Sequence, residues 1–191
     1  METPTLLTAD EFFRHPAAQE ASELVRGAIH MMTPAGGRHN VVAGRLYTRL
    51  STFAEERGLG IAFTDNLGYY LPIPGETRDT VRAPDASFVR AEQLPGGEIP
   101  IGFLRCAPDL AVEVLSPDDR PDELAARMRD YFAAGTRCVW VVDPDARTVT
   151  VHALDGTMRT VAPHDHLEGE PVLPGFRLPI AALFVGLRTR D

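Results

Sequence analysis

Apolar and polar positions along the first half of the chain predict one long helix among short strands. After the loop 33–37, apolar residues recur every three or four positions, which is the period of a helix with one buried face, and Gly58 supplies its stop. That face carries Val42, Leu46, Leu50, Phe53 and Ala54. Thr8 and Glu11 form a capping-box pattern that predicts a short helix from this point. Apolar runs predict strands at 23–25, 28–32, 60–64 and 68–71.

The second half of the chain predicts two parallel strands joined by a crossover helix. An apolar run at 110–115 is followed by a helix over about 121–134 and a second apolar run at 138–142. Strand, helix and strand of this length are typical of a right-handed unit with parallel strands. Asp155 and Gly156 indicate a hairpin turn, and the tail is expected to pack back on the core. The predicted class is α/β, at the border of α+β, with a mixed sheet in a single domain over residues 1–191.

Composition and charge exclude some classes of protein. A chain of 191 residues is long enough for a sizeable core, and with 44% hydrophobic and 24% charged residues its composition is that of an ordinary globular protein. No apolar run approaches a membrane span and the N-terminus lacks a signal-peptide pattern, so we expect no membrane partner. Cys106 and Cys138 have no zinc-type spacing, so we expect apolar packing positions and a cytoplasmic location. The net charge of −8 argues against non-specific coating of nucleic acid but permits a local basic cleft.

Two carboxylates are the strongest candidates for chemistry because each lies in a short apolar run. Asp85 lies in 83–89 and Glu113 in 110–115, separated by 113 − 85 = 28 positions. A carboxylate in a buried strand is costly unless it is hydrogen-bonded, paired or bound to a metal. Two of them on neighbouring strands indicate a site for a hard divalent cation. Local alternatives stay open, because Asp85 could accept backbone hydrogen bonds in a turn and Glu113 could pair with an arginine.

Arg127 is the third candidate, on the predicted crossover helix. It lies inside an apolar stripe, three positions after Leu124 and four before Tyr131, so its guanidinium could point back toward the acidic pair. The alternative is an arginine whose stem covers apolar surface while its head reaches water, and helical spacing favours neither. All 19 basic residues are arginines, so any mechanism must do without an ammonium side chain.

Several motifs of the chain occur together in one known group of proteins. They are ELVRG at 23–27, His39 ahead of a helix, Pro84–Asp85, PDLAVEVLSP at 108–117, Tyr131 with Ala134–Gly135, VWVVDP at 139–144 and LPGF at 173–176. In order and spacing these motifs resemble a large bacterial family of restriction-endonuclease-like proteins, abundant in cyanobacteria, within the PD-(D/E)XK nuclease superfamily. The resemblance covers nearly the whole chain. It implies a restriction-endonuclease-like mixed sheet flanked by helices.

The resemblance also implies metal-dependent hydrolysis of phosphodiester bonds in DNA, with Mg²⁺ or Mn²⁺ as cofactor and a homodimer as the common assembly. Asp85 matches the first metal-binding aspartate of the family and Glu113 matches the second acidic ligand. Glu23 matches an acidic residue that often completes the site. Carboxylates hold Mg²⁺, which polarises the phosphate and lowers the pKa of a bound water.

Two positions depart from the family pattern. Leu115 stands where the superfamily motif has lysine, and Arg127 stands where this family often has a lysine on the crossover helix. Arginine stabilises negative charge on a phosphate but does not give up a proton at neutral pH. Two alternatives to an endonuclease therefore stay open. One is a degenerate relative that acts as a nucleic-acid-binding or regulatory module. The other is an interaction protein whose acidic pair is neutralised by Arg127.

Other polar residues are weaker candidates. Asp109 is a rival ligand, four before Glu113 on the same strand face, although we expect it to end a loop. His39 is expected in the first turn of its helix with a solvent or loop contact, and a role near phosphate is the minor alternative. Ser116 is expected to cap the following helix. The cluster His164–Asp165–His166 resembles a metal site but is expected to be a polar loop.

Overall fold

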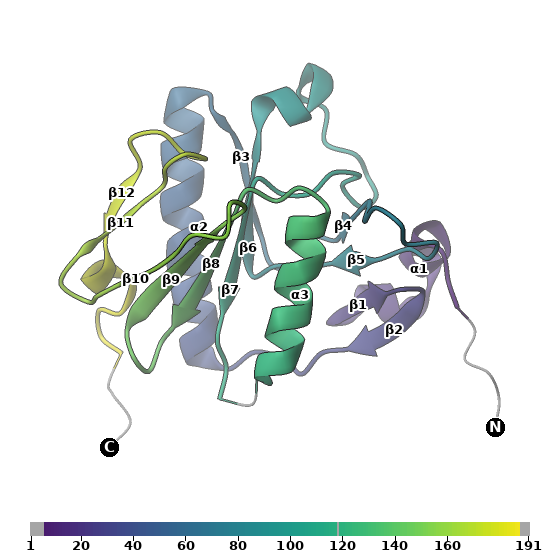
Figure 1. Cartoon of the computed structure of the whole chain (residues 1–191), viewed down its shortest axis with the longest axis horizontal. Helices are drawn as coiled ribbons and strands as arrows, with labels where there is room; N and C mark the ends of the chain where they lie inside the picture. The colour runs from purple at the N-terminus through teal and green to yellow at the C-terminus, as the bar shows by residue number, and fades with distance from the viewer. Residues whose placement is uncertain (1–5, 118, 188–191) are drawn as a thin grey trace.

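A six-stranded mixed sheet forms the centre of the protein, whose computed structural model describes residues 6–117 and 119–187. Helix α2 (Gly37–Arg57) covers one face of this sheet and α3 (Pro121–Ala133) covers the other (Figure 1). In spatial order the strands are β10 (Met158–Val161), β9 (Thr148–Ala153), β8 (Cys138–Asp143), β7 (Leu110–Val114), β6 (Ala86–Arg90) and β3 (Gly60–Thr64). Strands β7 and β8 run parallel, and the other neighbouring pairs run antiparallel. The predicted mixed sheet flanked by helices is confirmed.

A second, smaller sheet packs beside the first. Its order is β2 (Ala28–Met31), β1 (Ser22–Val25), β5 (Val81–Arg82) and β4 (Tyr69–Tyr70). The β1–β2 hairpin turns at Arg26 and Gly27, whose φ angles of 49° and 81° suit a tight turn with two left-handed residues. Ahead of it, Thr8 and Glu11 form the predicted capping box of α1 (Ala9–Arg14). This sheet brings β1 and β5 next to each other, which matters for the charged residues described below.

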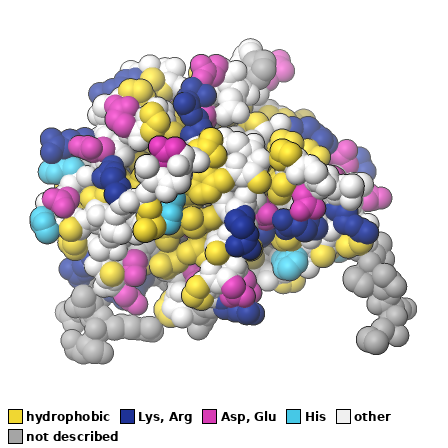
Figure 2. All heavy atoms as spheres, viewed as in Figure 1, with side chains coloured by type: hydrophobic (Ala, Val, Ile, Leu, Met, Phe, Trp, Pro, Cys, Tyr) yellow, Lys and Arg dark blue, Asp and Glu magenta, His cyan; other side chains and the backbone are white. Residues whose placement is uncertain are grey.

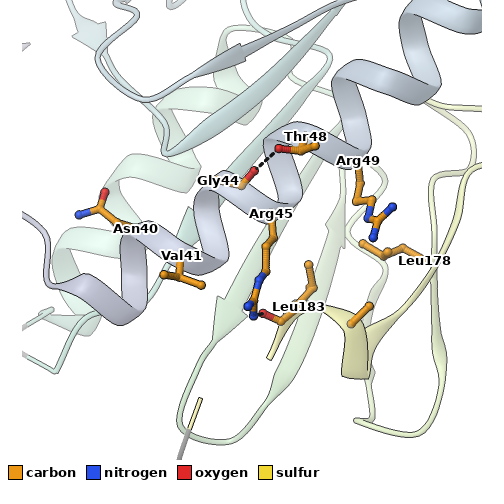
Figure 3. A pocket seen from close by; sticks show the side chains of 9 residues that line it. Asn40, Val41, Gly44, Arg45, Thr48, Arg49, Leu178 and Leu183 are labelled. Atoms are coloured by element: carbon orange, nitrogen blue, oxygen red, sulfur yellow. Dashed lines mark hydrogen bonds between the residues drawn. The ribbon is translucent and has the colours of Figure 1, made fainter. Parts of the chain in front are cut away.

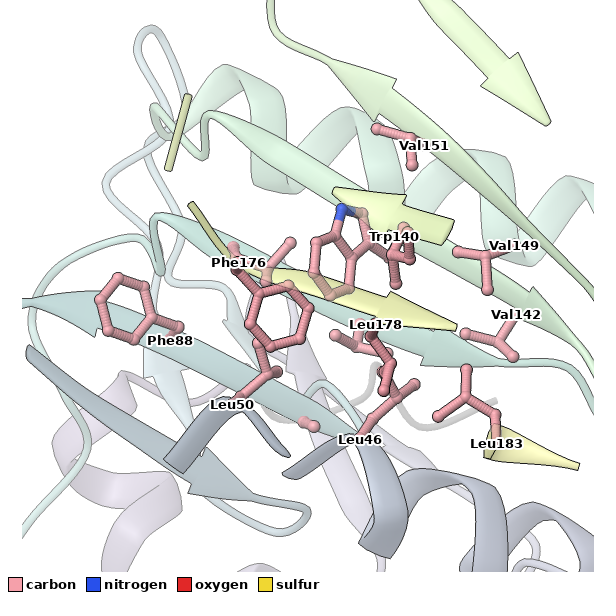
Figure 4. Close-up of a cluster of buried hydrophobic side chains, with 14 of the residues drawn as sticks. Leu46, Leu50, Phe88, Trp140, Val142, Val149, Val151, Phe176, Leu178 and Leu183 are labelled. Atoms are coloured by element: carbon pink, nitrogen blue, oxygen red, sulfur yellow. The ribbon is translucent and has the colours of Figure 1, made fainter. Parts of the chain in front are cut away.

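Alternation along β7 divides its side chains between the two faces of the large sheet. Leu110, Val112 and Val114 pack with α2, whereas Ala111 packs on the side of α3. Glu113 therefore points toward α3, because successive side chains of a strand leave opposite faces. On the other face, the predicted stripe of α2 is buried except for the half-buried Phe53. Figure 4 shows Leu46 and Leu50 against Phe88, Trp140 and Phe176.

The C-terminal segment packs back on the core, as predicted, and does so on the α2 side of the large sheet. Leu173, Phe176 and Leu183 belong to the same buried cluster as Trp140. The segment also forms an unpredicted hairpin of β11 (His166–Glu168) and β12 (Arg177–Pro179). His166 is therefore in a strand, and the predicted polar loop holds only for the residues before it. Short 3₁₀ segments lie at Pro16–Gln19, Ala91–Gln93, Pro95–Gly97 and Ile180–Leu183.

The entry to α3 differs from its prediction. Ser116 does not cap this helix: Arg120 is the N-cap residue and makes no side-chain cap hydrogen bond. The backbone amide of Ser116 instead donates to Asp119 Oδ2 at 2.7 Å and closes a turn ahead of the helix. The helix starts at Pro121 because proline is well tolerated in the first helical turn, where its missing N–H has no helical partner. Among the described helices, none is both long and apolar enough to cross a membrane. Cys138 is buried and Cys106 is half-buried.

Candidate active site

Asp85 and Glu113 lie opposite each other where β6 begins and β7 ends, in the middle of the large sheet. Ala86 is paired with Val112 in the antiparallel β6–β7 ladder, so the next pair outward is Asp85 with Glu113. The amide of Asp85 donates to Val112 O at 3.0 Å. In return, the amide of Val114 donates to Asp85 Oδ2 at 2.6 Å. The bend before β6 thus places the Asp85 carboxylate against the end of β7, beside Glu113.

Glu113 is 3% exposed and accepts hydrogen bonds at both carboxylate oxygens. Arg127 Nη1 donates to Oε2 at 2.6 Å, and the Tyr131 hydroxyl donates to Oε1 at 2.9 Å. Burial is the main cause that raises the pKa of Glu113 to about 7; the charge of Arg127 opposes this rise, and the charges of Asp85 and Glu23 add to it. A buried carboxylate with a strongly raised pKa beside other charges is a common mark of a functional site.

Arg127 points toward the carboxylates, which decides between the two orientations left open by the helical spacing. Its side chain is 24% exposed, and Nε lies 3.7 Å from Glu23 Oε2. The charge of Glu113, followed by that of Glu23, raises the pKa of Arg127 although burial opposes the rise. The guanidinium is therefore a permanent positive charge between two buried carboxylates.

Glu23 lies close to this pair but its oxygens are already used. Arg82 Nη1 donates to Glu23 Oε2 at 2.7 Å, and the amide of Ala83 donates to Oε1 at 3.0 Å. Arg82 in turn binds Asp130 on α3. The sequence prediction missed Arg82 and Asp130. The available signal was the position of Asp130, three residues after Arg127 on the same helical face.

His39 also reaches the site, from the first turn of α2. Its Nε2 lies 3.1 Å from Asp85 Oδ2, and its Nδ1 is buried without a hydrogen-bond partner among the described residues. Burial lowers the pKa of His39, but the hydrogen bond to Asp85 and the charges of Asp85, Asp119 and Glu113 outweigh it and raise the pKa overall. The expected first-turn position is confirmed, and the expected loop contact is made with Asp85 in the bend before β6.

Two other candidates lie elsewhere. Asp109 precedes β7 and accepts hydrogen bonds from the Arg90 amide at 2.9 Å, from Arg90 Nε at 2.7 Å and from Gln93. These bonds tie β6 to the start of β7, four residues from Glu113. His164 is exposed and lies 3.8 Å from the carboxylate of Asp165.

Asp85 and Glu113 suit a divalent cation as two ligands, without a third protein ligand beside them. Across residues 6–117 and 119–187, no three His, Cys, Asp or Glu side chains are grouped to hold a metal ion. Mg²⁺ is nevertheless often bound by one or two carboxylates together with water and substrate phosphate. Asp85 is 21% exposed at its side chain, and within the described chain its Oδ1 accepts no hydrogen bond. By residue type the donor set of Asp85 and Glu113 fits Mg²⁺ or Mn²⁺. Among the described residues Asp85 Oδ1 is open, whereas both oxygens of Glu113, like those of Glu23, already accept hydrogen bonds.

The surface around the pair is small and mixed in charge. A shallow pocket beside Glu113 is lined by Leu115, Asp119, Arg120, Glu123 and Arg127. Acidic and basic side chains lie next to each other on the molecular face that carries α3 (Figure 2). A broader pocket along α2 is formed by neutral residues with Arg45 and Arg49 (Figure 3). That pocket includes neither Asp85 nor Glu113 in its lining, so it is separate from the candidate site.

The fold and the facing carboxylates define a restriction-endonuclease-like protein, and comparison with known proteins gives the same class. A family model, Uma2, described as "Putative restriction endonuclease", matches residues 9–181. The chain belongs to this family. A crystal structure from Anabaena variabilis, described as "a putative nuclease belonging to DUF820", is similar with a TM-score of 0.77 and 23% identity, over 93% of this chain and 97% of that chain. At this identity the likeness shows the fold. No curated protein matches the chain.

Proposed function

We propose that this protein is a divalent-metal-dependent endonuclease that hydrolyses phosphodiester bonds in DNA. The main support is that Asp85, just before β6, lies opposite Glu113 on β7, with Arg127 2.6 Å from Glu113. Membership of a restriction-endonuclease family supports the same reaction class. Two carboxylates that can hold a divalent ion, with the positive charge of Arg127 beside one of them, suit the stabilisation of charge in phosphodiester hydrolysis.

In this proposal each residue has a separate task. Asp85 and Glu113 would hold Mg²⁺ or Mn²⁺, which when bound polarises the phosphate and lowers the pKa of water. The Val114 amide orients Asp85 by holding its Oδ2. The Tyr131 hydroxyl orients Glu113 by holding its Oε1. Arg127 stabilises the negative charge that develops on the phosphate, and it does so without transferring a proton.

A second candidate function is favoured by a specific feature of the same site. Both oxygens of Glu113 already accept bonds from Arg127 and Tyr131, and an arginine stands where the family often has lysine. These features also suit a catalytically degenerate relative that acts as a nucleic-acid-binding or regulatory module. The second candidate predicts DNA binding without cleavage.

Calorimetric titration with Mn²⁺ tests the metal site directly. We expect saturable binding by the wild-type protein and its loss in Asp85→Asn, which keeps the shape of the side chain but removes the charge. Asp155→Asn is the control, because Asp155 lies in the β9–β10 turn and binds the backbone of Thr157. Equal binding by all three proteins, or binding by none, would contradict the metal site.

Nicking of supercoiled plasmid then separates the two candidate functions. The endonuclease predicts Mg²⁺- or Mn²⁺-dependent nicking that is absent in Asp85→Asn. The degenerate module predicts a gel shift of DNA with no cleavage in either protein. We also propose a homodimer, the common assembly of the superfamily, and light scattering of the purified protein tests it by the mass in solution.

A further inference from the structure

A series of ion pairs leads from the candidate site to the surface loop before β5. Side chains of alternating charge follow one another within ion-pair distance. In order they are Glu113, Arg127, Glu23, Arg82, Asp130, Arg26 and Glu76. Buried charges are tolerated in a protein when each is paired with good geometry. The series therefore has to be intact for its buried members to stay charged.

Arg82 is the centre of this series. Its side chain is only 8% exposed and binds two carboxylates that are nearly inaccessible to solvent. Nη1 donates to Glu23 at 2.7 Å, while Nε donates to Asp130 at 2.9 Å and Nη2 donates to the same oxygen. The planar guanidinium makes this bridge possible, because its donors point in fixed, divergent directions.

Both carboxylates that Arg82 binds affect the position of Arg127. Asp130 lies on α3 between Arg127 and Tyr131, the two residues that bind Glu113. Holding Asp130 against β5 thus sets the position of α3 over Glu113. Glu23 lies 3.7 Å from Arg127 Nε, which makes no hydrogen bond in the described chain. With Glu23 already bound to Arg82, Arg127 gives its short bond to Glu113.

We infer that Arg82 is a positioning residue of the active site, which holds Glu23 and Asp130 so that Arg127 stays directed at Glu113. The consequence for catalysis rests on the proposed endonuclease function, whereas the effect on Arg127 does not. A lysine at position 82 keeps the charge but lacks the planar fork that makes the three bonds of Arg82 to Glu23 and Asp130. Arg127 is then expected to move toward Glu23 and to lose its fixed orientation.

The test compares Arg82→Lys with Arg90→Lys. Arg90 forms a similar ion pair with the buried Asp109, away from the site, so it controls for lost stability. The first measurement is the Nε–H signal of Arg127 in ¹⁵N–¹H NMR of the metal-free protein, identified by its absence in Arg127→Lys. We expect the signal to shift and broaden in Arg82→Lys and to be unchanged in Arg90→Lys.

The second measurement is plasmid nicking with Mn²⁺. In Arg82→Lys we expect kcat to fall roughly 10- to 100-fold, as for other residues that orient groups at metal sites, with KM changed less than about threefold. Arg90→Lys is expected to keep the wild-type kcat. If Arg82→Lys does not fold, Asp130→Asn tests the same inference, because it removes the charge of one of the two carboxylates that Arg82 binds.

The outcomes separate the two proposals. An altered Arg127 signal in a protein that neither binds Mn²⁺ nor nicks DNA would contradict the endonuclease and retain the positioning role. An unchanged signal and kcat in Arg82→Lys or Asp130→Asn, with only the melting temperature lowered as in Arg90→Lys, would overturn the positioning role. In that case Arg82 would stabilise the fold and nothing more.

Discussion

Arg127 donates to Glu113 at 2.6 Å from the helix that directly follows the Glu113 strand. Because α3 returns over the sheet, the strand and the helix supply the two halves of the ion pair within a single crossover unit. The guanidinium neutralises part of the acidic site before any metal ion arrives. A divalent cation that binds Glu113 would therefore lie close to the positive charge of Arg127, which already contacts the same carboxylate.

Removing this charge should strengthen metal binding and weaken catalysis together. We expect Arg127→Met to bind Mn²⁺ more tightly by about tenfold, since a nearby cation no longer repels it. Nicking should fall by roughly 100-fold or more, because the developing charge on the phosphate loses its stabilising partner. Arg127→Lys should stay within about tenfold of wild type. Calorimetry and plasmid nicking measure the two effects, and a full nicking rate in Arg127→Met would argue against any catalytic role for this residue.

The pH dependence of stability should report the buried carboxylate. The pKa of Glu113 is raised from 4.5 to about 7, so the folded state binds a proton more tightly than the unfolded state. Its contribution to the free energy of unfolding is fully present below pH 4.5 and is lost as the pH rises through about 7. Glu113→Gln stays neutral and should not show this loss. At pH 8 we expect the variant to be more stable than wild type by on the order of 3 kcal/mol, because each pKa unit corresponds to about 1.4 kcal/mol.

Urea unfolding of the metal-free protein at pH 5 and pH 8 checks this expectation. The gain from Glu113→Gln should be small at pH 5 and large at pH 8. Glu168→Gln on the exposed side of β11 is the control and should show no such difference. A destabilised Glu113→Gln at pH 8 would mean that the ion pair with Arg127 outweighs the cost of burial.

Two buried tyrosines offer a matched comparison for the hydroxyl that holds Glu113. Tyr131 donates to the carboxylate at 2.9 Å, whereas the Tyr69 hydroxyl lies 2.7 Å from the neutral hydroxyl of Ser87. Hydrogen bonds to charged groups contribute more than neutral ones. We expect Tyr131→Phe to lower the free energy of unfolding by about 2 kcal/mol at pH 8, and Tyr69→Phe to lower it by about 1 kcal/mol. Equal losses in the two variants would mean that Glu113 is neutral at pH 8.

Asp109 should behave as a structural residue in spite of its position near Glu113. Its carboxylate accepts three hydrogen bonds from Arg90 and Gln93, so Asp109→Asn should lower the free energy of unfolding by about 2–3 kcal/mol. Binding of Mn²⁺ to the folded variant should equal that of wild type. Thermal unfolding and calorimetry at the same temperature test both statements. Loss of metal binding in a folded Asp109→Asn protein would make Asp109 the ligand in place of its neighbours.

Local spacing was sufficient to predict most helices and strands. The stripe from Val42 to Ala54 repeats with the helical period, and it is buried as predicted because one face of a helix meets the sheet. The approximate bounds of α3 and the parallel pairing of β7 with β8 also followed from short-range pattern. The 164–166 segment was only partly predicted, since β11 depends on pairing with β12, from which eight residues of the chain separate it.

The sequence by itself determined which residue types were available near the site: Asp85 and Glu113 in apolar runs, and an arginine on the crossover helix in place of lysine. It could not determine the partner of each charge. Arg82 contacts Glu23 across 59 positions and Asp130 across 48. The first pair forms only when β1 and β5 come together in the small sheet, and the second only when this sheet packs against α3. Strand alternation places a side chain on one face or the other, but the packing of the layers decides which opposite charge it meets there. Tertiary structure therefore decided that Arg127 faces Glu113, that Glu23 is held by Arg82, and that His39 reaches Asp85.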